Sequence, residues 1–227
     1  MNKRCIVNVA TGEFYCKMQQ RLIDSFQDSV DLVYHFNIGG NKQPYTSNDH
    51  EATGIDLLIW DDILPNNSRP HSESPYGFKI HAIKAAFEKG YTSILWIDSP
   101  AYAVKEDISP IFDKIEKEGY YVMSHIDPLE TYITRETCDK LAVNYNWIAG
   151  KNLPSGSCYG FDLSNIAIQS FFATFARCES LGLFKHEKRH DESILAVLMV
   201  GCILPIFTND PLFQSDSPEC VIKSGGL

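Results

Sequence analysis

The chain has 227 residues, which is enough to bury a sizeable core in one domain or two closely joined lobes. Hydrophobic residues make up 44% and charged residues 22% of the sequence, as is ordinary for a globular protein. Twenty basic and twenty-nine acidic residues give a formal net charge of −9, and no cluster of Lys and Arg offsets it. This charge argues against general nucleic-acid binding, but one small anion could still bind through local dipoles and single cations.

The seven cysteines are scattered along the sequence, and none forms a CxxC pair. Such a pattern is typical of free thiols in a reducing compartment rather than of a disulfide framework or a zinc site. The first residues lack the apolar region of a signal peptide, and the longest apolar run, residues 194–207, is too short to cross a bilayer. We therefore expect a soluble, cytoplasmic protein without a membrane span.

The first part of the chain alternates strand-like and helical segments, as βα units do. An apolar run at residues 5–9 predicts a short strand, and apolar residues at helical spacing predict a helix over 13–26. The next two expected strands are residues 31–36 and 57–60. The first of these two ends at Asn37 and the glycines at positions 39 and 40.

The middle of the chain begins with a segment rich in Pro, Ser and Asn, residues 66–74, which predicts a loop. A helix is expected over 75–89, because it starts at a proline, carries apolar residues on one face and stops at a glycine. The strand 93–97, the helix 108–117 and the strand 120–124 are expected to follow.

Residues 127–155 show no clear periodicity, and we expect them to be irregular. Beyond them the alternation resumes, with a strand expected at 157–163, helices at 165–181 and 191–200, and a last strand at 203–208. Neither a repeat nor a linker interrupts the pattern. The sequence therefore predicts one α/β domain.

Asp98 follows directly on the apolar run 93–97, and open α/β sheets bind their ligands where such strands end. A carboxylate at this point can hold a ribose hydroxyl or a divalent metal, and a metal that bridges a diphosphate neutralises the charge of a departing nucleotide. The alternative is an aspartate that only caps a helix or ties a loop. The pair Asp61-Asp62 is a rival metal position or a solvated turn.

A second group of candidates, His190-Asp191-Glu192, stands just before an apolar run. Adjacent residues of a helix point about 100° apart, so Asp191 and Glu192 are not expected to share one role. Near an anomeric carbon, a carboxylate can act as base or nucleophile, or can stabilise oxocarbenium charge. The alternative is that both acids only favour the dipole of a helix in its first turn, and that His190 is a loop residue.

The end of the first strand offers a third group. Backbone amides at Ala10 and the Thr11 side chain could line a nucleotide, and Tyr15 could stack on a base. This segment is neither a GxGxxG motif nor a P-loop. Lys79 or His81, on the helix before Asp98, could reach a phosphate, although most exposed helix lysines bind nothing.

Four segments taken in order resemble the nucleotide-sugar glycosyltransferases of the GT-A fold: residues 9–12 with Tyr15, then 91–98, 156–162 and 190–193. That fold has a nucleotide-binding first strand, an Asp-x-Asp strand, a Gly-containing strand on the acceptor side and a late acidic motif that opens a helix. The late His-Asp-Glu-Ser is most similar to the retaining α1,3-galactosyl and N-acetylgalactosaminyl transferases of the blood-group type.

The resemblance implies a Rossmann-like GT-A domain over residues 1–227 with a mixed central sheet, in which about 1–126 bind the nucleotide sugar and about 127–227 serve the acceptor and catalysis. Glu192 matches the family's proposed nucleophile or oxocarbenium stabiliser, and inverting enzymes of the same fold would use Asp191 as general base. The remaining expected contacts are Ala10, Thr11, Tyr15, Lys79, Asp98 and Ser99 for the donor, and Ser157, Tyr159 and Asp162 for the acceptor.

The family's Asp-x-Asp motif is Asp98-Ser99-Pro100 in this chain, so the second acid is missing. Three readings stay open. Asp98 alone suffices for Mn²⁺ or Mg²⁺, His190 or Asp191 completes the metal shell, or the protein works without a metal. Bacterial relatives of that family also lack the paired acids.

We therefore expect a glycosyltransferase that moves a sugar from a nucleotide-diphosphate donor, with a UDP-sugar favoured, to a hydroxyl group of a glycan or another acceptor. One alternative is a non-catalytic module that binds a nucleotide sugar or a protein. Another is a sugar-1-phosphate nucleotidyltransferase, although its Gly-rich basic loop is reduced here to Gly12 and Lys17. An Asp-nucleophile phosphatase is a third, but Pro100 occupies the place of its second acid.

Overall fold

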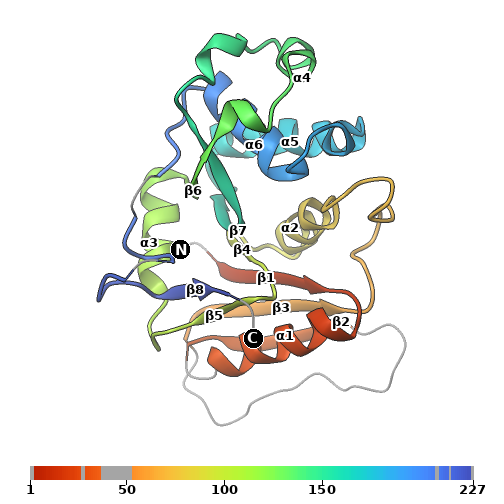
Figure 1. Cartoon of the computed structure of the whole chain (residues 1–227). Coiled ribbons are helices and arrows are strands. Elements are labelled where there is room, and N and C mark those ends of the chain that lie inside the picture. Colours follow the sequence, from red (N-terminus) through yellow and green to blue (C-terminus); the bar gives the residue numbers. More distant parts are fainter. Residues whose placement is uncertain (1–2, 27–28, 37–52, 208–209, 215, 226–227) are drawn as a thin grey trace.

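The computed structural model describes residues 3–26, 29–36, 53–207, 210–214 and 216–225. Its centre is a six-stranded sheet in the order β2-β3-β1-β4-β7-β6, and β5 pairs with β8 in a small second sheet (Figure 1). The strands are β1 (Arg4–Ala10), β2 (Asp31–Phe36), β3 (Ile55–Asp61), β4 (Ser93–Ile97), β5 (Ala101–Ala103), β6 (Tyr120–Pro128), β7 (Asn152–Asp162) and β8 (Ile222–Ser224).

The central sheet is mixed, which confirms the expected α/β fold with a mixed sheet. Strands β2, β3, β1 and β4 run parallel, β7 is antiparallel to β4, and β6 is antiparallel to β7. The parallel strands present their carboxyl ends at one edge, where Ala10 pairs with Asp61 and β4 ends next to Asp98. This is the edge at which open α/β sheets bind ligands.

Helices cover both faces of the sheet (Figure 1). They are α1 (Glu13–Ser25), α2 (Phe78–Glu88), α3 (Ser109–Glu118), α4 (Arg135–Lys140), α5 (Ile166–Ser180) and α6 (His190–Gly201). Successive residues of a strand point to opposite faces. Accordingly, Leu95 of β4 packs in the apolar cluster with α1 and α3, and its neighbour Trp96 packs in the cluster with α2, α5 and α6.

Local sequence explains where α5 begins and where α3 begins and ends. Asn165 caps α5, because its side-chain oxygen accepts hydrogen bonds from the backbone N–H of Ala167 at 3.0 Å and of Ile168 at 3.4 Å. Helix α3 begins with a proline in its first turn and ends at Gly119, whose φ of 87° suits a residue without a Cβ. Among the described residues, no helix combines the length and the apolar character that crossing a bilayer requires.

Most expected elements are present with shifted ends, but several expectations need correction. The helix expected over 75–89 begins only at Phe78, because Tyr76 has a φ of 59°, which is not helical. Residues 127–155 are not irregular throughout, since β6 extends to Pro128, α4 lies within them and β7 starts at Asn152. The short pair β5–β8 is absent from the sequence-based expectation.

The strand expected over 203–208 is wrong. Residues 203–206 form no strand, and Phe207 makes only an isolated bridge with Met123. Ile203 instead has a φ of 57° and closes α6. Its N–H bonds to the Val200 carbonyl at 3.1 Å, and the next N–H bonds back to Met199 at 2.8 Å, which is the Schellman pattern. Thr208 lies outside the described residues, as do Asn37, Gly39 and Gly40.

Candidate functional site

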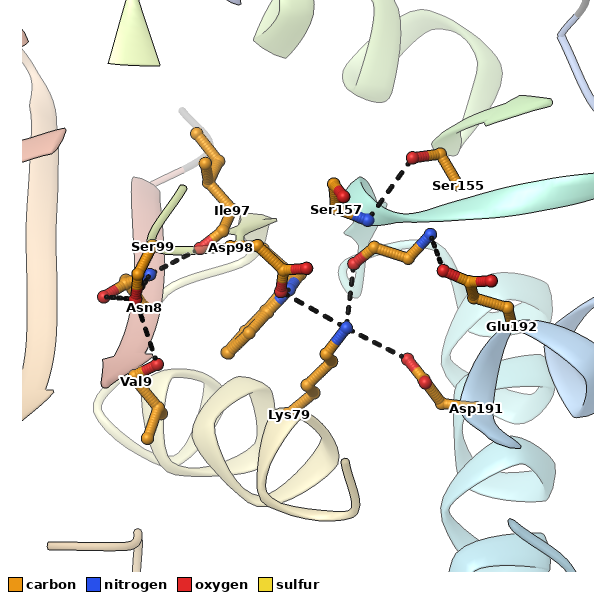
Figure 2. Close-up of polar contacts among 12 residues, drawn as sticks. Asn8, Val9, Lys79, Ile97, Asp98, Ser99, Ser155, Ser157, Asp191 and Glu192 are labelled. Carbon is orange, nitrogen blue, oxygen red and sulfur yellow. Dashed lines mark hydrogen bonds and ion pairs between the residues drawn. The ribbon is translucent and has the colours of Figure 1, made fainter. Parts of the chain in front are cut away.

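The buried ammonium group of Lys79 lies between two carboxylates that come from different elements (Figure 2). Its Nζ donates a hydrogen bond to the carbonyl of Gly156 at 2.9 Å and lies 3.3 Å from Asp98 Oδ1 and 3.3 Å from Asp191 Oδ2. The side chains of Lys79 and Asp191 are each 3% exposed, whereas that of Asp98 is 28% exposed. Burial lowers the pKa of Lys79, but the carboxylates of Asp191 and Asp98 outweigh it and hold the pKa above its usual value.

Three elements bring these groups together. Strand β4 ends next to Asp98, whose Oδ1 accepts a hydrogen bond from the indole N–H of Trp96 at 2.8 Å. The backbone N–H of Asp98 donates to the carbonyl of Ser157 at 2.8 Å, which ties β4 to β7 at this edge. Helix α2 supplies Lys79, and the first turn of α6 supplies Asp191. The site therefore combines the parallel and the antiparallel parts of the sheet.

Glu192 contacts the backbone of β7. Its Oε1 accepts a hydrogen bond from the N–H of Gly156 at 3.0 Å, and its Oε2 lies 2.9 Å from Arg189 Nε. The approach depends on glycine, because a Cβ at position 156 would lie 2.6 Å from Oε1 and 2.7 Å from Cγ of Glu192. The two adjacent acids thus point to different partners, as their places on a helix require.

Burial shifts the protonation of both late acids. It raises the pKa of Asp191 to about 6, and nearby Glu192 and Asp98 add to this while Lys79 opposes it. Burial also raises the pKa of Glu192, against the opposing charges of Lys79 and Arg189. Three carboxylates share one buried lysine and one arginine, so negative charge is in excess. Asp191 is therefore poised to exchange a proton near neutral pH.

Several polar atoms of the site lack hydrogen-bond partners. Among the described residues, the buried side-chain atoms of this kind include Tyr159 Oη, Asp191 Oδ2 and Glu192 Oε2, although the two carboxylate oxygens keep their ion pairs. Tyr159 is fully buried, and burial together with the neighbouring carboxylates raises its pKa well above the usual value. Its hydroxyl group is thus a neutral donor. Buried groups of this kind normally have partners, so Tyr159 leaves one hydrogen-bond donor of the cluster unsatisfied.

A buried network of side-chain amides connects the strands near the carboxyl ends of β1, β3 and β4. The side-chain N–H₂ of Asn8 donates to the carbonyl of Ile97 at 2.7 Å, and Gln19 donates to Asn8 Oδ1 at 2.7 Å and to the Trp60 carbonyl at 3.0 Å. Ser99 Oγ lies 3.3 Å from Asn8 Nδ2 (Figure 2). These bonds fix the ends of β1, β3 and β4 relative to one another. The role of Asn8 and Gln19 was not expected from the sequence, but a lone Asn in an apolar strand is the signal for it.

The expected nucleotide-binding segment lies at the same edge. Ala10 is buried at the end of β1, whereas Thr11 is exposed and Tyr15 is 49% exposed on the first turn of α1. The N–H of Gly12 donates to Asp62 Oδ1 at 3.0 Å, so Asp62 ties this turn. Thr11 and Tyr15 are thus accessible at this edge of the sheet, whereas Lys79 is buried.

Two expected residues lie away from the cluster. Asp162 pairs with Ser93 at the opposite end of β4, and its Oδ1 accepts hydrogen bonds from the N–H of Ser164 at 3.0 Å and from the Ser164 hydroxyl at 2.6 Å. It ties a turn and is not part of the site. His81 points to Glu179, with 3.4 Å between Nε2 and Oε2. Ser157 and Tyr159, by contrast, lie beside Asp98 and Lys79.

The described residues do not form a metal site of their own. Within the part of the chain that the structure describes, no three His, Cys, Asp or Glu side chains are grouped to hold an ion. His190 Nδ1 lies 2.9 Å from the carbonyl of Phe184, and the contacts of Asp98 with Trp96 and Lys79 both use Oδ1. Asp98 Oδ2 makes no such contact with the described residues, and the Asp98 side chain is 28% exposed. Mg²⁺ can bind proteins through one carboxylate, but its other ligands must then come from substrate phosphates and water.

Comparison of the chain with protein-family models and with curated proteins found no match. A buried cation, three carboxylates of unequal exposure and a neutral phenol meet at the edge of the mixed sheet where its parallel strands have their carboxyl ends. This set can orient hydroxyl groups, accept a proton near neutral pH and stabilise a developing positive charge.

Replacing Gly156 with alanine should displace the Glu192 carboxylate, because the new Cβ cannot coexist with Oε1 in its present place. Overpacking of this kind costs roughly 1–3 kcal/mol of stability. We expect a loss of the proposed transfer activity that exceeds any loss of folded protein at 25 °C, measured by activity and by urea unfolding. Gly225→Ala is the control, since nothing lies within 4 Å of that position. Unchanged activity in Gly156→Ala would show that Glu192 is not needed where it lies.

Proposed function

We propose that the protein is a GT-A-type glycosyltransferase that moves a sugar from a nucleotide-diphosphate donor to an acceptor hydroxyl. The observation that supports this most is the convergence of Asp98, from the end of β4, with Asp191 and Glu192, from the start of α6, around one buried lysine. Sequence segments far apart thus meet where a donor is expected to bind.

Each group has a distinct role in this proposal. Asp98, the most exposed acid, accepts a hydrogen bond from a ribose hydroxyl of the donor through Oδ2. The backbone at Ala10 and the side chain of Thr11 contact the nucleotide, and Tyr15 stacks on its base. Lys79 is a positioning residue, because its ammonium group holds Asp98 and Asp191 rather than a phosphate.

The reacting centre of the sugar lies beside the late acids. Glu192 stabilises positive charge on the anomeric carbon or attacks it, which would retain the configuration. Asp191, with a pKa raised to about 6, can instead take the proton of the acceptor hydroxyl, which would invert the configuration. Ser157 and Tyr159 border this place on the side of β7, where the acceptor enters.

The net negative charge of the site affects how strongly it can attract the leaving diphosphate. Asp98, Asp191 and Glu192 exceed the nearby cations Lys79 and Arg189 by one charge, so a diphosphate is not attracted by these side chains alone. Mn²⁺ or Mg²⁺, when bound with the donor, would neutralise that charge. A UDP-sugar remains the favoured donor, and a glycan or another hydroxyl compound the favoured acceptor.

A second candidate function is a nucleotide-sugar-binding module without catalysis. It is favoured by the fact that Asp98 Oδ1 and the Lys79 ammonium group are already satisfied by protein groups, as in a purely structural ion pair. Slow hydrolysis of a bound donor distinguishes the two functions, because a binding module should show none above background.

A thermal-shift screen against UDP-, GDP-, CMP- and dTDP-sugars, each with Mn²⁺ and with EDTA, tests the proposal first. A ligand that binds only the folded state raises the melting temperature by mass action. We expect a shift with one nucleotide class. A shift that EDTA abolishes would make the ion part of the donor complex, and one that survives EDTA would favour a metal-free reaction. No shift with any donor would contradict the proposal.

We further propose a cytosolic location. All seven cysteines are free thiols, and five of them are buried. That use of cysteine is typical of proteins in a reducing compartment.

A further inference from the structure

Tyr76 is a partly exposed aromatic residue beside the buried ammonium group of Lys79. Lys79 Nζ lies 4.9 Å from the centroid of its ring, closer than to the rings of Trp96 at 5.3 Å and Tyr159 at 5.9 Å. Trp96 and Tyr159 are buried, whereas Tyr76 is 37% exposed. Of these three rings, only that of Tyr76 can contact a ligand that enters from solvent.

The backbone at Tyr76 is held in a conformation that tyrosine rarely adopts. Its φ is 59°, in the left-handed region that favours glycine or asparagine. Strain of this kind persists only where the surroundings enforce it, and it gathers at ligand-binding positions. The conformation turns the chain just before α2 begins at Phe78. It therefore fixes the ring of Tyr76 next to Lys79, which lies in the first turn of α2.

A buried carboxylate on α5 enforces this turn. Glu179 Oε1 accepts a hydrogen bond from the Ser74 hydroxyl at 2.6 Å and forms an ion pair with Arg69 at 3.0 Å. Gly77 passes so close that a Cβ there would lie 2.4 Å from Ser74 Oγ and 2.7 Å from Glu179 Oε1. Ser74 and Gly77, which lie on either side of Tyr76, thus both pack against Glu179 of α5, and these contacts hold the loop before α2 in place.

The ring also packs beside the late acidic motif. Its centroid lies 5.7 Å from that of His190 and 4.9 Å from that of His71, and the His71 contact is edge-on. Asp191 follows His190 directly in the chain and binds the Lys79 ammonium group. Tyr76 therefore stands at the end of the site where the proposed reaction occurs. The exposed Tyr15, by contrast, follows β1 at the end expected to bind the base.

We propose that Tyr76 is a specificity-determining residue whose ring stacks on the apolar face of the sugar that the donor carries. This inference rests on the proposed function, because it places a sugar nucleotide in the site. A pyranose ring has a face of C–H groups that matches a half-exposed aromatic ring. The contacts with Glu179 keep the ring of Tyr76 in place before the ligand arrives, which lowers the entropic cost of binding.

The test compares the affinity for a sugar nucleotide with that for its own nucleoside diphosphate, UDP-galactose and UDP in the first instance, or the pair that the donor screen selects. Both are measured by calorimetry on the full chain. In Tyr76→Ala, we expect affinity for the sugar nucleotide to fall about tenfold while affinity for the diphosphate stays within about twofold. Tyr76→Phe should keep both affinities, since the ring remains.

Two controls separate stacking from a structural role. Tyr145→Ala removes another tyrosine that contacts a cation, Arg135 at 4.2 Å, away from the site, and should change neither affinity. If Tyr76→Ala melts early, Tyr76→Asn replaces it, because asparagine tolerates the positive φ. A ring that only shields Lys79 would alter both affinities together and lower the melting temperature.

The outcomes are distinct. Equal loss for sugar nucleotide and diphosphate, or no loss for either, would overturn the role of Tyr76 and leave the proposed function standing. Wild-type protein that binds none of the sugar nucleotides would overturn the proposed function and the inference together. A loss confined to the sugar nucleotide, restored in Tyr76→Phe, is the only result that supports the stacking.

Discussion

Lys79→Met should abolish the proposed transfer activity and destabilise the fold by about 3–5 kcal/mol, the usual effect of removing one partner of a buried ion pair. Methionine fills nearly the same space, so the loss reports the charge. Asp98 and Asp191 would then face each other, next to Glu192, without the ammonium group that lies 3.3 Å from each of the first two. Urea unfolding and donor turnover measure the two effects.

The pH dependence of this destabilisation has a definite sign. Asp191 already has a pKa raised to about 6 in the folded protein, and removal of Lys79 raises it further because an attractive charge is lost. Protonation then favours the folded state at low pH. The difference in unfolding free energy between wild type and variant should therefore be smaller at pH 5 than at pH 8. A difference that does not change between these pH values would contradict the shared-lysine arrangement.

Lys84→Met is the matched control. Lys84 lies on the same helix α2 but is exposed. The same substitution there should change stability by less than about 0.5 kcal/mol, as is usual for surface positions. If Lys79→Met behaved like Lys84→Met, the buried cluster would not matter for either folding or activity.

The second large effect is expected when the acids Asp98 and Glu192 are replaced. Asp98→Asn and Glu192→Gln should each lower donor turnover by about 100- to 10,000-fold, the range for a lost acid, base or charge-stabilising group. Both changes preserve shape. Glu192→Gln keeps an oxygen that can accept the hydrogen bond from the N–H of Gly156. Melting temperatures should stay near that of the wild type, because Lys79 keeps Asp191 as a partner in Asp98→Asn.

Asp216→Asn and Glu88→Gln control for the chemical change, since both acids are exposed. Full activity in both site variants would refute catalysis by this cluster. Loss in Asp98→Asn alone, with Glu192→Gln unaffected, would leave a donor-binding site and would move the reacting centre to Asp191. The two substitutions thus separate the donor end of the site from the reactive end.

The sequence predicts the α/β fold well because its local signals and its packing agree. Strand β4 and its neighbours are apolar runs that a buried sheet requires, and α5 carries a capping asparagine, Asn165. The signal fails where tertiary contacts decide. Ile203 takes the left-handed position that ends a helix, where glycine is normally expected, so an apolar run that resembles a strand is in fact a helix terminus.

The candidate site is predictable in part for the same reason. Asp98, Asp191 and Glu192 stand at a strand end and a helix start, positions that the sequence makes visible. The central place of Lys79 was less visible, because nothing local distinguishes a buried lysine from an exposed one. Tyr76 could not have been singled out, since its position depends on Glu179, which is more than a hundred residues away and acts through the loop before α2.

The way in which the cluster is divided along the chain has a consequence for biosynthesis. Lys79 and Asp98 lie in the first half of the polypeptide and are synthesised early. Asp191 lies on α6, which is synthesised later. Until that helix is made, the nascent protein must keep an ammonium group in water that the finished protein buries. We therefore expect α6 to complete the packing around Lys79, because it supplies the second of the two carboxylates that neutralise the ammonium group.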